Sequence, residues 1–170
     1  NARPNRTRRS DPIEFRPAMK KQAPPIPDDR PILPFETAQA WDTWLAKHGG
    51  SSPGIYIKIA KKDSGIRSVT YPEALEVALC YGWIDAIKRS FDEEWFLQKF
   101  LPRKTRSIWS EINKKKVQAL IKAKLMRPAG LAAVEQAKAN GEWDKAYAPA
   151  RTITVPPDLG SALKKNKKAA

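Results

Sequence analysis

Six cationic side chains lie close together in the stretch Pro102 to Lys116, PRKTRSIWSEINKKK, which contains one acidic residue. Three of them, Arg103, Lys104 and Arg106, stand before the expected start of a helix. A helix N-terminus presents partial positive charge and unpaired N–H groups, which attract an anion. Cations beside the N-terminus strengthen this attraction. The stretch therefore predicts an anion site. Four further cations are assigned to the same anion- or nucleic-acid-binding surface: Lys61, Lys62, Lys88 and Arg89.

The same stretch also predicts a helix with one apolar side. At 100° per residue, Val117 and Leu120 share a face with Trp109, whereas Lys115 and Lys122 lie on the opposite, solvated face. Asn113 falls inside the apolar stripe, where a buried amide needs hydrogen-bond partners. We therefore expect the Asn113 side chain to be buried and hydrogen-bonded, so that it contributes to stability.

Asp85 stands in GWID between apolar neighbours and is expected to share a strand face with Trp83 and Ile87. An acid on an apolar face is costly unless it is paired, and Arg103 or Lys61 could pair with it. One reading is a structural ion pair or a backbone hydrogen bond, and the other is a general acid or base with a shifted pKa. A possible small-ligand pocket is accordingly assigned to the following residues: Trp83, Asp85, Trp109 and Asn113.

The sequence lacks the residues that several kinds of metal binding and catalysis require. The chain contains one histidine, His48, and one cysteine, Cys80, so neither a Cys-based zinc site nor an internal disulfide is possible. His48 stands in a KHGG context that is typical of a helix end rather than of a catalytic triad. No glycine-rich phosphate loop or EF-hand spacing is found. We therefore expect no cofactor, no metal and no catalytic residue.

Charge and proline divide the chain into three parts. Lys and Arg total 32 against 18 acidic residues, a net charge of +14, which favours acidic partners such as nucleic acid. Residues 1–34 hold 8 of the 15 prolines and are expected to form a flexible basic arm. Residues 151–170 are expected to form a basic tail. The six tryptophans all lie in residues 35–150, which predicts one folded domain there.

The spacing of apolar residues predicts the elements of this domain. A helix is expected after Thr37, a strand over 54–61, a helix between Thr70 and Gly82, and a hairpin over 83–100. Helices are then expected over 107–125 and 128–140. The order α-β-α-β-β-α-α indicates an α+β fold, with a small, mostly antiparallel sheet packed with helices. No apolar run is long enough to span a bilayer, so a soluble, cytoplasmic protein is expected, although the absent initiator Met leaves a removed leader open.

Four blocks of sequence, KKDSG, YGWID, PRKTRSIWSEIN and LMRPAG, resemble those of the YdeI/OmpD-associated, or bacteriocin-protection, family. The resemblance extends over about residues 35–157, with Ala86 and Lys104 in place of the usual glycine and arginine. It implies an α+β domain without a known cofactor and with no agreed catalytic residues. The family's name implies a role in envelope stress or bacteriocin tolerance.

Three functions remain open on these grounds. The leading hypothesis is a non-enzymatic module that binds a polyanion, such as nucleic acid or a nucleoprotein assembly, through its basic face and tails. The alternatives are an envelope-stress factor that acts through protein contacts and a small-ligand protein with a pocket around Asp85. A pocket that encloses Asp85 would favour the small-ligand protein, and an exposed apolar patch would favour the protein contacts.

Overall fold

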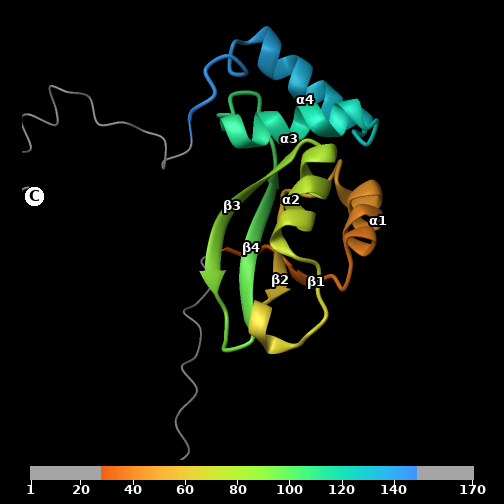
Figure 1. The fold of residues 1–170 in the computed structure, drawn as a ribbon, viewed down its shortest axis with the longest axis vertical. Helices are drawn as coiled ribbons and strands as arrows, with labels where there is room; N and C mark the ends of the chain where they lie inside the picture. The colour runs from red at the N-terminus through yellow and green to blue at the C-terminus, as the bar shows by residue number, and fades with distance from the viewer. Residues whose placement is uncertain (1–27, 149–170) are drawn as a thin grey trace, which may run out of the picture.

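The domain is built on a four-stranded sheet in the order β1-β2-β4-β3, seen in a computed structural model that describes residues 28–148 (Figure 1). The elements are, in chain order, β1 (Ile32–Pro34), α1 (Ala38–His48), β2 (Ile55–Ala60), the 3-10 helix η1 (Lys62–Ser64), α2 (Tyr71–Cys80), β3 (Trp83–Ser90), β4 (Trp95–Pro102), α3 (Glu111–Lys122) and α4 (Pro128–Ala139). The strand pairs β2–β4 and β3–β4 are antiparallel, and β1 pairs with β2 in parallel. The predicted α+β fold and its order of elements from α1 onward are confirmed.

β1 was not predicted, because its three residues lie within the segment assigned to the flexible arm. Its backbone pairs Ile32 with Tyr56 and Pro34 with Lys58. The residues just before it are also held to the sheet, because the Asp28 carboxylate pairs with Lys99 of β4 and accepts a hydrogen bond from the Tyr56 hydroxyl at 3.3 Å. The folded domain therefore begins at or before Asp28. Residues 1–27 of the arm and the tail 151–170 lie outside the described residues.

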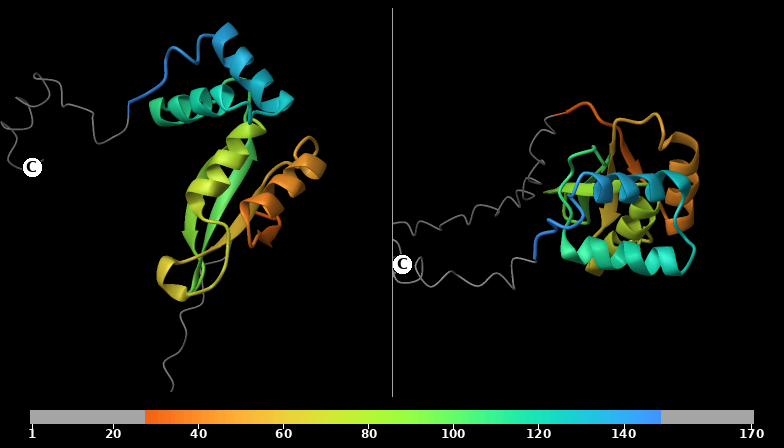
Figure 2. Two further views of the ribbon diagram at one scale, coloured as in Figure 1. Left: turned by 45° about the vertical axis from the view of Figure 1, so that its right-hand side comes forward. Right: turned by 90° about the horizontal axis from the view of Figure 1, so that it is seen from above.

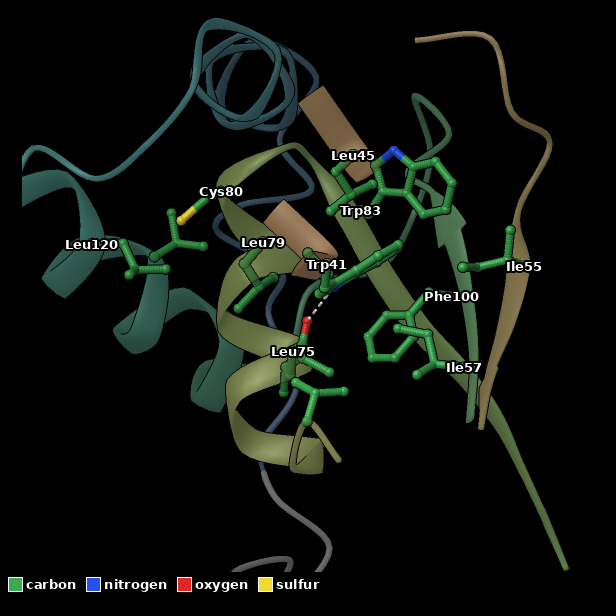
Figure 3. Packing of buried hydrophobic residues seen from close by; sticks show 14 of the residues in the cluster. Trp41, Leu45, Ile55, Ile57, Leu75, Leu79, Cys80, Trp83, Phe100 and Leu120 are labelled. Carbon is green, nitrogen blue, oxygen red and sulfur yellow. Dashed lines mark hydrogen bonds between the residues drawn. The ribbon is translucent and has the colours of Figure 1, made fainter. Parts of the chain in front are cut away.

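The helices α1 and α2 cover one face of the sheet and enclose the main core (Figures 1 and 2). Trp41 of α1 is fully buried, and its indole N–H donates to the carbonyl of Ala74 in α2 at 3.0 Å, as the dashed line in Figure 3 shows. The rings of Trp83 and Phe100 lie 6.0 Å and 5.9 Å from that of Trp41. This aromatic cluster fixes the two helices against the central strand β4 and its neighbour β3.

Both helices begin where the sequence predicts, and each start has a side-chain cap. The Thr37 hydroxyl accepts a hydrogen bond from the N–H of Ala40, which caps α1. At the start of α2, the Glu73 carboxylate accepts the N–H of Thr70 at 2.9 Å, the reciprocal half of a capping box. This bond holds the pKa of Glu73 below its usual value. The sequence therefore located the beginnings of α1 and α2 correctly.

The helices α3 and α4 pack at one end of the sheet, whereas η1 and the turn of the β3–β4 hairpin lie at the opposite end (Figure 2). The prediction that α3 begins at Ser107 is wrong. Ser107 closes a turn with Lys104, and the backbone of Tyr147 pairs with the chain on both sides of Ser110, which caps the helix instead. Trp109 is therefore buried just before the helix rather than on it.

None of the helices within residues 28–148 has the length and apolar composition needed to cross a membrane.

Candidate polyanion interface

Four exposed cations gather on α3 and the loop before it, at one end of the domain. We call them the α3 basic surface, which consists of Lys104, Arg106, Lys115 and Lys122. Within residues 28–148, none of the four forms an ion pair or a side-chain hydrogen bond. Residues 103–126 contain eight Lys or Arg and one acid, a net charge of +7, whereas residues 28–148 together contain 20 Lys or Arg and 15 acids, a net charge of +5. The rest of the described chain is therefore slightly acidic.

The periodicity of α3 explains this separation of charge. Val117 and Leu120 are buried against the core, and Lys115 and Lys122 lie two turns apart on the outer side of the helix. The remaining lysines of the helix are partly neutralised, because Lys114 pairs with Glu111 at 3.5 Å and Lys116 pairs with Glu76 of α2 at 3.0 Å. The predicted solvated face of the helix is thus present, and it presents unpaired charge.

Arg103 does not lie free on the loop, as the sequence had suggested. Its guanidinium carbon lies 3.6 Å from the centre of the Trp109 ring, and its Nη1 donates to the carbonyl of Ile108 at 3.2 Å. Its Nε and Nη2 are shielded from solvent and have no hydrogen-bond partner among the described residues. Desolvation lowers the pKa of Arg103 to about 10, partly opposed by the nearby Asp85 carboxylate. Arg103 is therefore half-buried against the Trp109 ring, and stacking on that ring offsets part of the cost of its burial.

The other four predicted cations lie at the far end of the sheet. Lys88 and Arg89 pair with Gln98 and Leu97, and Gln98 is five residues before Arg103, or about 16 Å along an extended strand. Lys61 and Lys62 follow the end of β2 and are exposed, beside the hairpin turn. Four acids share that end of the domain: Asp63, Asp92, Glu93 and Glu94. The structure therefore does not bring these cations together with the α3 basic surface.

Two of those side chains are also engaged locally. The Lys61 ammonium donates to the carbonyl of Asp92 at 2.7 Å, and that of Lys88 lies 4.2 Å from the centre of the Phe96 ring. Lys61 is consequently not the partner of Asp85. The four acids offset the charge of the cations at the hairpin end, and these contacts hold Lys61 and Lys88 in place.

The partner of Asp85 is a tyrosine that sequence reasoning missed. The hydroxyl of Tyr71, at the start of α2, donates to the Asp85 carboxylate at 2.7 Å. Burial, together with this bond, raises the pKa of Tyr71. Within residues 28–148 Asp85 forms no ion pair, and a bulge follows it in β3, which leaves Ile87 47% exposed rather than on the face of Asp85. No local signal links Tyr71 to Asp85, because the contact depends on how α2 crosses the sheet.

The side chains assigned to a pocket contact different neighbours. Trp83 packs against Trp41 and donates to the carbonyl of Gly49 at 3.2 Å, in the core between α1 and the sheet. Trp109 instead packs on Trp143, with ring centres 4.9 Å apart. These residues fill the interior of the domain. They give no geometric support to a small-ligand site around Asp85.

Asn113 is not the buried, hydrogen-bonded side chain that was expected. Its side chain is half-buried and makes no hydrogen bond with the described residues, and only its backbone N–H is capped, by the Ser110 hydroxyl at 3.1 Å. Ile112, an apolar residue in the first turn of α3, is 49% exposed. The apolar side of α3 is thus narrower than predicted.

Comparisons with known proteins add a family but no activity. A family model described as "Domain of unknown function (DUF8412)" matches residues 33–133, from β1 into α4. No curated protein matches the chain, and no solved structure matches it. This match does not test the resemblance to the YdeI/OmpD-associated family, which stays a prediction. Since the match covers more than half of the 170 residues, the chain belongs to the DUF8412 family, a family of unknown function.

Proposed function

We propose that this domain is a binding module for a polyanion, with nucleic acid or a nucleoprotein assembly as the leading candidate, and that it binds through the α3 basic surface. The observation that carries the proposal is the segregation of charge. Residues 103–126 have a net charge of +7, although the described domain as a whole has only +5. Such a concentration of one sign attracts an extended partner of the opposite sign.

The positions of the four cations support a polyanion rather than a single small anion. Lys115 and Lys122 are seven residues apart on α3, which separates their backbones by about 10 Å. Lys104 and Arg106 extend the surface beyond the N-terminus of the helix. An extended chain of phosphates can contact all four, whereas one phosphate cannot. Exposed cations without ion pairs also lose little when they bind, because no existing partner has to be displaced.

Salt dependence separates this surface from the general charge of the protein. Replacing Lys104, Arg106, Lys115 and Lys122 with Gln in the full chain removes four charges from the α3 basic surface. The matched control replaces Lys61, Lys62, Arg67 and Lys88, which are equally exposed but lie toward the hairpin end. Both variants have the same net charge, so a difference between them does not come from net charge.

The measurement is binding to duplex DNA and to structured RNA at several salt concentrations. Each phosphate contact contributes a slope of about −0.9 in a plot of log K against log salt on B-DNA. We expect the α3 variant to lose roughly two to four units of slope, and the control to lose less than one. Equal losses in the two variants would show that binding reflects net charge alone. No binding by the unmodified chain would refute the proposed function outright.

A further inference from the structure

The segment 140–148, which follows α4, passes beside the N-terminus of α3 and carries an exposed tyrosine (Figure 1). Tyr147 is 56% exposed. Its backbone is held on both sides, because its N–H donates to the carbonyl of Trp109 at 3.0 Å and its carbonyl accepts the N–H of Glu111 at 3.0 Å. These two bonds form a parallel bridge between Tyr147 and Ser110. The aromatic ring is therefore presented to solvent from a backbone that is already ordered.

The bridge also determines which side chains of the two segments point outward. Paired residues point to the same side, and successive residues of an extended chain alternate between the two sides. Trp109 is buried, so Ser110 and Tyr147 point to the opposite, solvated side. Ile108, which precedes Trp109, is 65% exposed, the highest value among the large apolar residues of the described chain. An aromatic ring and an apolar side chain thus reach solvent from neighbouring segments.

The loop before α3 brings positive charge to this ring. Residues 103–110 contain three cations and no acid, and two of the cations, Lys104 and Arg106, belong to the α3 basic surface. The loop is tied to the end of α4, because the side-chain amide of Asn140 donates to the carbonyl of Thr105 at 2.6 Å. The cations of the loop and the segment that carries the ring are therefore held beside one another.

The charges closest to the ring agree with this arrangement. Desolvation lowers the pKa of Arg103 to about 10, and the Tyr147 phenol is one of the groups that oppose this shift, so the ring lies near Arg103. The carboxylates of Glu111 and Glu142 are each paired with a lysine three residues later, at 3.5 and 3.4 Å. Asp144 is exposed and forms no ion pair with the described residues. Around the ring, one unpaired acid therefore faces the three cations of the loop.

We propose that the α3 basic surface binds single-stranded nucleic acid, with an unpaired base stacked on the Tyr147 ring and the adjacent phosphates on Lys104 and Arg106. This inference rests on the proposed function and specifies the form of the nucleic acid. Inside a duplex, the faces of each base are covered by the neighbouring base pairs, so an exposed tyrosine has no free face to stack on. A single strand offers such faces, and proteins that bind it combine a cationic surface with exposed aromatic rings.

Binding of matched oligonucleotides to the full chain tests the form of the ligand. The probes are single-stranded oligothymidine of about 12 nucleotides, a duplex of the same length, and an abasic strand that keeps the phosphates but lacks the bases. A duplex carries the denser charge, so a purely electrostatic surface prefers it. We expect the chain to bind both but to bind oligothymidine more tightly than the duplex and more tightly than the abasic strand. The same titration with oligouridine separates RNA from DNA as the source of the strand.

Substitutions of Tyr147 test the role of the ring. Tyr147→Ala is expected to weaken binding of oligothymidine by about 5- to 150-fold, the loss typical of one stacked base. The factor is expected to be the same at every salt concentration, because stacking neutralises no phosphate. Tyr147→Phe keeps the ring and should retain the affinity. The matched control is Ile87→Ala, which removes an exposed apolar side chain from β3 and should leave binding unchanged.

The results that would overturn this inference differ from those that would overturn the proposed function. Tighter binding of the duplex, or an abasic strand bound as tightly as oligothymidine, would exclude base stacking and leave the polyanion function in place. Unchanged binding by Tyr147→Ala would do the same and would assign the exposed ring to a protein partner instead. If Tyr147→Ala does not fold, the abasic strand with the unmodified chain decides. Absence of binding to every nucleic acid would overturn both.

Discussion

Gly130 is the position at which α4 touches the end of α2, and Gly130→Ala tests that contact. An added Cβ would lie 2.2 Å from the carbonyl oxygen of Cys80 and 2.8 Å from its carbonyl carbon. Both are backbone atoms, so neither can rotate away as a side chain would. The same oxygen accepts the N–H of Arg127 at 2.9 Å, immediately before α4. The substitution therefore forces α4 away from α2 at the point where its first turn is fixed.

The expected cost is the balance of one favourable and two unfavourable contributions. In an isolated helix, Ala is favoured over Gly by about 1 kcal/mol. Overpacking of a close contact costs about 1 to 3 kcal/mol, and more when the backbone must move. Loss of the Arg127 to Cys80 hydrogen bond adds about 1 kcal/mol. We therefore expect Gly130→Ala to lower the free energy of unfolding by about 1 to 3 kcal/mol, although helix propensity alone predicts a gain.

Urea unfolding followed by tryptophan fluorescence measures this change. The matched control is Gly50→Ala, since Gly50 has no atom within 4 Å of an added Cβ and does not need a positive φ. This control is expected to leave stability unchanged or to raise it by up to about 1 kcal/mol. A Gly130→Ala protein as stable as the unmodified chain would refute the close approach of α4 to α2.

Two further predictions concern single side chains. Asn113→Leu should leave the midpoint of urea unfolding unchanged, because the Asn113 side chain has no hydrogen bond to lose among the described residues; a clearly lower midpoint would show that the amide is bonded after all. Hydrogen bonding to Lys99 is the main cause that lowers the pKa of Asp28 from 3.8 to about 2. The ionised form is thus favoured in the folded state, so this contribution is present above pH 4 and is lost as the pH falls toward 2. Thermal unfolding between pH 5 and 2 should be less pH-dependent in Asp28→Asn, and parallel curves would contradict the pairing.

The elements that were predicted correctly are those whose signals are local. Thr37 and Thr70 lie next to the helices that they begin, and Ile55, Ile57 and Ile59 alternate along one strand. β1 has no such signal, because a strand of three residues is defined by its partner, Tyr56 and its neighbours, more than 20 residues later. The start of α3 was placed too early for the same reason, since Tyr147 holds the chain around Ser110 from 37 positions away.

The candidate interface was likewise predictable only where its signals are local in the chain. The outward positions of Lys115 and Lys122 follow from the period of the helix, and their exposure agrees with it. The role of Arg103 does not follow, because an arginine that is free on a loop and one that is packed on an aromatic ring look alike in a sequence. Its position is decided by the Trp109 ring, which in turn packs on Trp143, 34 residues later in the chain.

The central position of β4 affects how the domain can form during synthesis. β2 pairs with β1 along one edge and with β4 along the other. β2 ends at Ala60, but β4 is complete only at Pro102, 42 residues later. At about 5 to 20 residues per second, this delay lasts roughly two to eight seconds on the ribosome. A nascent chain in which β2 forms before β4 presents Ile55, Ile57 and Ile59 on a strand with an unpaired edge, a template on which other chains can aggregate. Slower translation between residues 60 and 102 would prolong this exposure, and faster translation would shorten it.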